Sequence, residues 1–198
     1  CRERVENVRI FREKSSRAQT KKAAATPQRY GTEIITSSTS VLVPKVSSER
    51  RRYIPLGFIG PETFCSDLVF LIADASVYQF GVLHSQFHNA WMRTVCGRLE
   101  SRYRYSGGVV YNNFVWPNPT SKQQEAIEAC AQAILDTRDN YPDKSLANLY
   151  DPDKMPADLL AAHRALDAAV EAAYGVNFDG DEEKIVAHLF KLYAQATA

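Results

Sequence analysis

The chain has 198 residues, 45% of them hydrophobic, so it can bury the core of one large domain or two small ones. It has no run of roughly 18 apolar residues, which excludes a membrane span, and no signal-peptide pattern. It also has no Cys-x-x-Cys pair, which argues against a zinc site or a disulfide scaffold and fits the reducing cytoplasm. The net charge of +1 conceals a division, because residues 1–120 hold 17 Lys and Arg against 9 Asp and Glu, whereas residues 121–198 hold 7 against 14.

A basic amphipathic helix is predicted for residues 2–25, with Val5, Val8 and Phe11 along one side and Pro27 after its end. The chain starts without Met inside this helix, so we expect it to be a piece of a longer protein. The basic first part favours an anionic partner, although solvated surface charge explains the same asymmetry equally well.

Short strands are predicted after this helix. Residues Glu33–Thr36 are β-prone, and Val41–Val46 contains Pro44, which favours an edge strand. The apolar run Asp67–Asp74, flanked by charge, is typical of a buried strand, and Val77–Leu83 is compatible with another.

A helix and a hairpin are predicted for the next part of the chain. Phe87, Trp91 and Val95 fall at i, i+4 and i+8, and Gly97 stands where a helix C-terminal cap would lie. After it, two tyrosine-bearing arms surround Ser106–Gly108, which is a hairpin pattern.

The last part of the chain is alanine-rich and is predicted to form three helices. The first begins near Thr120 with a capping-box pattern, and the third follows Asp181. The second has Pro156 in its first turn and Gly175 just beyond its end, and its apolar stripe is Leu159, Leu160, His163, Leu166 and Val170. The expected fold is therefore α+β, with short strands and helices followed by an all-α part.

No catalytic constellation is visible in the sequence. His84 and His88 are four residues apart, but the Glu of a His-Glu-x-x-His metal site is missing, so packed histidines are the favoured interpretation over a metalloenzyme. His163 lies on the apolar stripe of its helix, and the acids at 179–184 lack the ligand series of a calcium loop. A nucleophile elbow, a P-loop and a Gly-x-Gly-x-x-Gly run are all missing.

The basic residues form a more suggestive pattern. On an extended segment Arg98, Arg102 and Arg104 would point to one side of the chain. A protein that grips a DNA duplex needs such cations, together with hydroxyl donors, for the phosphate oxygens. Residues of these types also gather upstream, and the candidates for backbone or base contacts are Lys45, Ser47, Ser48, Arg50, Arg51, Arg52 and Arg98.

Glu100 and Arg102 fit a second task, which is reading bases. Arg can donate two hydrogen bonds to guanine O6 and N7, and a carboxylate can accept one from the cytosine amino group. Together they could read one C·G pair, each good contact giving about 1–3 kcal/mol of discrimination. The alternative is an exposed ion pair worth about 0–1 kcal/mol, which the residues alone favour slightly.

A family resemblance changes this balance. The segments Pro44–Phe58, Ser66–Pro117 and Asn118–Pro156 resemble the C-terminal part of the MmeI-like DNA methyltransferases, which are fused restriction–modification enzymes. The run Phe80–Pro117 is long enough to make the resemblance specific. It implies a target-recognition domain over residues 1–118 and a helical C-terminal domain over residues 119–198.

The resemblance also implies site residues and partners. Glu100 and Arg102 match the pair of positions that such proteins vary to choose one base pair, and Arg104 matches a neighbouring specificity position. An N6-adenine methyltransferase domain of the same parent chain would bind S-adenosylmethionine, so we expect double-stranded DNA as a partner and no cofactor in this part. The chain departs from the family at Val115, where proline is expected. The rival interpretation is a protein-interaction module with a basic surface.

Overall fold

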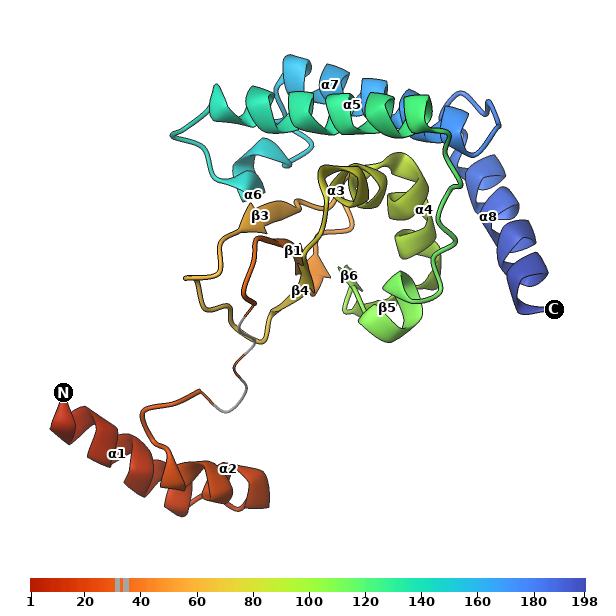
Figure 1. The fold of residues 1–198 in the computed structure, drawn as a ribbon. Coiled ribbons are helices and arrows are strands. Elements are labelled where there is room, and N and C mark those ends of the chain that lie inside the picture. Colours follow the sequence, from red (N-terminus) through yellow and green to blue (C-terminus); the bar gives the residue numbers. More distant parts are fainter. Residues whose placement is uncertain (31–32, 34–35) are drawn as a thin grey trace.

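The computed structural model of the chain describes residues 1–30, 33 and 36–198. All its strands lie in the first part of the chain, and helices make up the last part, which confirms the predicted α+β class (Figure 1). One antiparallel sheet has the order β3-β1-β4 and consists of β1 (Ser40–Pro44), β3 (Gly57–Ile59) and β4 (Val69–Ala73). The other has the order β2-β6-β5 and consists of β2 (Val46–Ser47), β5 (Gly97–Leu99) and β6 (Arg102–Arg104).

The first sheet corrects two predictions. Strand β1 is central, not an edge strand, and Pro44 is tolerated because the pairing with β3 covers only Ser40–Leu42, so one side of the proline faces no strand. Strand β4 forms where a buried strand was predicted, but it is an edge strand and only partly buried. Of the β-prone run Glu33–Thr36, residues 34–35 lie outside the described residues.

The N-terminal helix is shorter than predicted. Helix α1 (Arg2–Glu13) is followed by its C-cap Lys14, and the chain resumes as α2 (Ala18–Lys22) and a 3-10 turn, η1 (Ala23–Ala25). Two serines stand at the break, and serine hydroxyls compete with helical hydrogen bonding. The Arg12 guanidinium then fastens the returning segment by donating to the carbonyls of residues 23, 26 and 29.

Helix α3 (Val77–His84) occupies the run Val77–Leu83 that was compatible with a strand, so that prediction is wrong. It begins with a capping box, in which the Ser76 hydroxyl accepts from the Gln79 amide at 3.2 Å and the Gln79 side chain accepts from the Ser76 amide at 2.9 Å. Helix α4 (Gln86–Val95) confirms the predicted helix. Gly97 is not its cap, because it is the first residue of β5.

The predicted tail helices are confirmed as α5 (Ser121–Asp139), α7 (Ala157–Ala173) and α8 (Glu182–Thr197). Thr120 and Gln123 form the predicted capping box, and Gly175 has a φ of +70° beyond the end of α7. A one-turn helix, α6 (Leu146–Leu149), was not predicted. None of the described helices has the length and apolarity needed to cross a bilayer.

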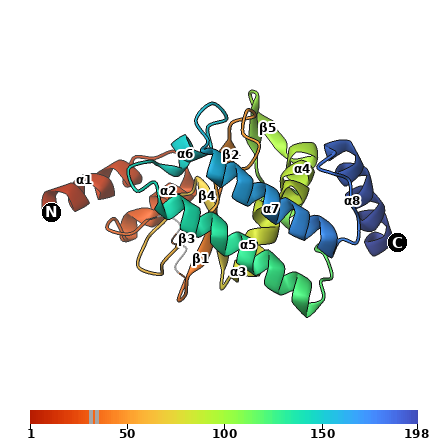
Figure 2. The same cartoon turned by 90° about the horizontal axis from the view of Figure 1, so that it is seen from above.

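The helical tail shares its core with the strand-containing part. Helices α5 and α7 run side by side, and α5 packs against α3 (Figures 1 and 2). Gly81 of α3 allows the close approach, since a Cβ there would lie 2.9 Å from Ile127 and 3.1 Å from Ala131. The buried Arg138 guanidinium donates to the Leu56 carbonyl at 2.8 Å. Packing and polar contacts thus join both parts of the chain.

Candidate nucleic-acid interface

The second sheet ends in a short hairpin made by β5 and β6. Its two-residue turn is Glu100–Ser101, and Glu100 has a φ of +58°, a left-handed conformation that is uncommon for any residue with a Cβ. The predicted hairpin around Ser106–Gly108 is wrong. Ser106 instead begins a π-helical turn, η2 (Gly107–Tyr111), by accepting from the Val109 amide.

The strand register divides the arginines between two faces. Arg98 lies opposite Tyr103, so these two side chains share one face, while Arg102 and Arg104 share the other. The prediction that all three arginines point to one side is therefore wrong, because the turn at Glu100 reverses the chain between them. The Arg98 guanidinium stacks over the Tyr103 ring at 4.1 Å and donates to the Ser101 carbonyl at 3.0 Å. Arg98 thus braces the hairpin.

The outer face of the hairpin presents charged groups to solvent. Arg102 donates to the Glu100 carboxylate at 2.6 Å, and their side chains are 47% and 76% exposed. Arg104 is exposed and makes no ion pair with another described residue. Its neighbour across β5 is Gly97, around which a Cβ would meet nothing within 4 Å. A ligand can therefore reach all three charged side chains.

A buried histidine supports this hairpin from behind. His88 Nδ1 lies 2.9 Å from the Leu83 carbonyl, which can only accept, so Nδ1 carries the proton and Nε2 accepts from the Tyr105 hydroxyl at 3.1 Å. Burial lowers the pKa of His88 to about 4, so the ring is neutral near pH 7. Both ring nitrogens are thus used in packing, one on the end of α3 and the other on Tyr105, the residue after β6, as the packed-histidine interpretation holds.

His84 also lies in the core, beside the buried Arg138 guanidinium and stacked on the Tyr150 ring. Burial and the nearby guanidinium hold the pKa of His84 well below its ordinary value, so this ring is neutral too. Within the described residues, no three His, Cys, Asp or Glu side chains lie close enough together to hold a metal ion.

The upstream candidates approach the hairpin through β2, which pairs with β6. Lys45 precedes β2, and its ammonium lies 4.7 Å from the centre of the Phe70 ring. Ser47 is only 4% exposed, and its hydroxyl lies 3.4 Å from an Arg51 nitrogen. Ser48 is half-buried. Ser47 therefore faces the protein, while Lys45 and Ser48 reach the surface.

The three consecutive arginines have different surroundings. Arg50 is exposed and forms an ion pair with Asp153 at 2.6 Å. Arg52 is exposed and donates to the Gln86 side chain at 3.1 Å. Arg51 is half-buried, and its Nε is shielded from solvent without a hydrogen-bond partner. Arg50 and Arg52 are therefore the members of this run that a ligand can reach.

Among the residues that the structure describes, two ion pairs connect the basic first part with the acidic tail. Besides the pair of Arg50 with Asp153, the Arg93 guanidinium makes two 2.7 Å hydrogen bonds to the Glu182 carboxylate. Part of the charge division is thus neutralised within the chain. Sequence reasoning missed Arg93 because an arginine in the last turn of a helix resembles an ordinary surface residue.

Comparisons with known proteins agree on one family. The model of the MmeI target recognition domain matches residues 1–118, and the model of the MmeI C-terminal domain matches residues 119–198. DNA methyltransferase A of Bacillus subtilis (strain 168) is 41% identical over 196 residues, which are 98% of this chain and 22% of that protein. The type IIL restriction–modification enzyme MmeI, solved in complex with DNA, superposes with a TM-score of 0.94 at 45% identity, covering 98% of this chain and 26% of that one.

Proposed function

This chain belongs to the MmeI family, of which it carries the target recognition domain and the C-terminal domain, and we propose that it recognises one double-stranded DNA sequence for a site-specific N6-adenine methyltransferase of the restriction–modification type. It spans about a quarter of the length of the two relatives. Methyl transfer is therefore assigned to a domain of the parent protein outside this chain, which would flip the target adenine out of the duplex. Whether the parent also cleaves DNA depends on domains that lie outside this chain.

The observation that supports this proposal best is the outer face of the β5–β6 hairpin, which Arg98 braces. A two-stranded ribbon fits the major groove, which is about 12 Å wide and displays a distinct pattern for each base pair. Arg102 would donate to guanine O6 and N7, and Glu100 would accept from the amino group of the paired cytosine. Their ion pair in the free protein holds both side chains next to each other at the tip. Arg104, on the same face, would contact a neighbouring base pair.

The remaining cations are assigned to the DNA backbone according to their exposure. Arg50, Arg52, Lys45 and Ser48 lie at the surface and would bind phosphate oxygens, which fix the register but carry no sequence information. Ser47, which is buried, and Arg51, whose guanidinium is directed to the Ser47 hydroxyl and the Ala147 carbonyl, would instead support the loop that carries them. Arg98, the third candidate with a structural task, would keep the hairpin rigid.

S-adenosylmethionine is the methyl donor that such a parent enzyme would use. One cavity of the described chain, about 410 Å³, is lined mainly by charged and polar groups, among them Arg52, Asp167 and Glu171. Its one aromatic side chain, Phe87, is stacked on Tyr174 with 4.5 Å between the ring centres and is only 1% exposed, so it offers no free face to an adenine ring. These residues do not fit the cofactor, and we assign its site to the rest of the parent.

Two measurements test the proposal. The methylated motif of the full-length parent is found by sequencing DNA from cells that express it, and binding of the parent to a duplex with that motif is compared with a scrambled duplex. We expect tighter binding to the motif, and we expect both affinities to fall steeply between 50 and 200 mM salt, as phosphate contacts require. A parent that binds neither duplex would favour the protein-interaction module. The ion pairs of Arg50 and Arg93 with acidic side chains show that this basic surface can bind acidic protein groups.

A further inference from the structure

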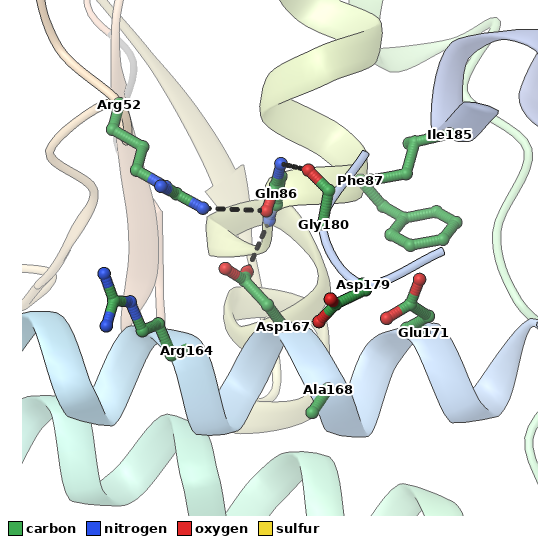
Figure 3. A pocket seen from close by; sticks show the side chains of 10 residues that line it. All are labelled: Arg52, Gln86, Phe87, Arg164, Asp167, Ala168, Glu171, Asp179, Gly180 and Ile185. Carbon is green, nitrogen blue, oxygen red and sulfur yellow. Dashed lines mark hydrogen bonds between the residues drawn. The ribbon is translucent and has the colours of Figure 1, made fainter. Parts of the chain in front are cut away.

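Gln86, the first residue of α4, makes three hydrogen bonds to other parts of the chain. It is only 5% exposed. Its backbone amide donates to Asp167 Oδ1 at 2.7 Å, its side-chain nitrogen donates to the Gly180 carbonyl at 2.7 Å, and its side-chain oxygen accepts from Arg52 at 3.1 Å (Figure 3). A single buried side chain thus joins an exposed arginine to the helical tail.

The partners of Gln86 in the tail are themselves fixed. Gly180 has a φ of +72°, and a Cβ there would lie 3.2 Å from the Gln86 side-chain oxygen, so glycine suits both the backbone and the close contact. Asp167 lies on α7, and its second carboxylate oxygen accepts from the Tyr53 hydroxyl at 2.6 Å. The tail therefore holds Gln86, and it also holds Tyr53, which is the residue next to Arg52.

The backbone of Arg52 is held as well. Arg93 donates from Nη1 to the Arg52 carbonyl at 2.8 Å, while its other two nitrogens bind Glu182 at the start of α8. Arg52, Gln86 and Arg93 all line one cavity of about 390 Å³ between the arginine run and the tail. Both the main chain and the side chain of Arg52 are thus oriented from the helical part.

We infer that Gln86 is a positioning residue for DNA binding, through which the C-terminal domain holds the Arg52 guanidinium in place for a phosphate. This inference rests on the proposed function. A guanidinium has five N–H donors, and Gln86 engages only one of its nitrogens, so the remaining donors stay available to a phosphate. A side chain that is already oriented loses less conformational entropy on binding than a mobile one.

A double-mutant cycle in the full-length parent tests this inference, with duplex affinity at 0.1 M salt as the readout. One phosphate contact contributes a salt slope of about −0.9, which corresponds to about eightfold in affinity at this salt concentration. We expect Arg52→Ala to weaken binding by about eightfold and Gln86→Met to weaken it several-fold. In the Arg52→Ala background, Gln86→Met should have no further effect, because Gln86 acts through Arg52.

Tyr174→Phe is the matched control. The Tyr174 hydroxyl donates to the Val115 carbonyl at 2.6 Å, so this variant also loses a contact between the two parts of the chain, but one that involves neither Arg52 nor Gln86. It should leave duplex affinity unchanged. A Gln86→Met variant that binds DNA as the wild type does, binds it more tightly, or loses the same factor in both backgrounds would overturn the inference. If the wild-type parent binds no duplex at all, the proposed function itself fails.

Gly180→Ala provides a second variant in case Gln86→Met folds poorly. It leaves Gln86 in place but forces a Cβ against its side-chain oxygen. The affinity should again fall several-fold in the wild-type background and not in the Arg52→Ala background. An equal fall in both backgrounds would mean that the contact serves only the stability of the fold.

Discussion

Replacing Glu100 by glycine should separate the stability of the hairpin from its ability to choose a base. Glu100 is the turn residue with a φ of +58°, and its carboxylate is paired with Arg102. If the side chain is kept for reading DNA, removing it should cost specificity but little stability. If it is kept for the fold, the reverse should hold.

The expected change in stability follows from three opposing effects. The left-handed conformation costs a residue with a Cβ about 1–2 kcal/mol, which glycine avoids. Glycine loses about 0.5–1 kcal/mol through its greater freedom in the unfolded chain. The lost ion pair, which is exposed, contributed about 0–1 kcal/mol. These effects nearly cancel, so the free energy of unfolding should stay within about 1 kcal/mol of the wild type.

The expected change in specificity is larger. Losing one base contact removes about 1–3 kcal/mol of discrimination, which is about 5- to 150-fold in the preference for one base pair. Urea unfolding measures the stability, and the methylated motif of the full-length variant measures the specificity. Asp74→Gly is the control, because Asp74 has a similar φ of +55° outside the hairpin, and its motif should stay unchanged. An unaltered motif with Glu100→Gly, or a loss of stability above about 2 kcal/mol, would refute this reasoning.

Three further variants test other parts of the account. Arg98→Ala should lower the free energy of unfolding by about 1–2 kcal/mol in urea titrations, because a cation–π contact and a hydrogen bond within the hairpin are lost; unchanged stability would mean that Arg98 is free for DNA. Asp153→Asn should release Arg50 and tighten binding to random duplex by less than about tenfold in an anisotropy assay, whereas weaker binding would assign Asp153 a supporting role. Burial raises the pKa of Asp167 from 3.8 to about 6, so the folded chain binds that proton more tightly and stability from this group falls as the pH rises from about 4 to about 6. Asp167→Asn should therefore make the free energy of unfolding rise more steeply with pH in that range, by up to about 1.4 kcal/mol per pH unit, and an unchanged slope would contradict the shift.

The helical tail could be predicted from the sequence because its signals are local. Thr120, Gln123, Pro156 and Gly175 mark helix ends through hydrogen bonds and backbone angles within a few residues. Helix α3 was misinterpreted because it is apolar on all sides, so its sequence shows no periodicity. Ser76 and Gln79 formed a capping-box signal that would have identified it.

The hairpin could not be located in this way. Its turn contains neither glycine nor asparagine, while the Ser106–Gly108 segment carries the usual turn residues but begins a π-helical turn. The charged residues Glu100, Arg102 and Arg104 were nevertheless chosen as candidates, from their residue types together with the family resemblance, and base reading by them stays a prediction. Which of the arginines face solvent depends on the register and on contacts from the tail, and these are tertiary features.

The most direct test of base reading is a charge swap at the tip of the hairpin. Glu100→Lys combined with Arg102→Asp places the donor and the acceptor in exchanged positions on the same exposed turn. The methylated motif of the full-length swap variant, found by sequencing host DNA, should differ from the wild-type motif at one base pair and match it elsewhere. A variant that methylates the unaltered motif with wild-type efficiency would contradict the account.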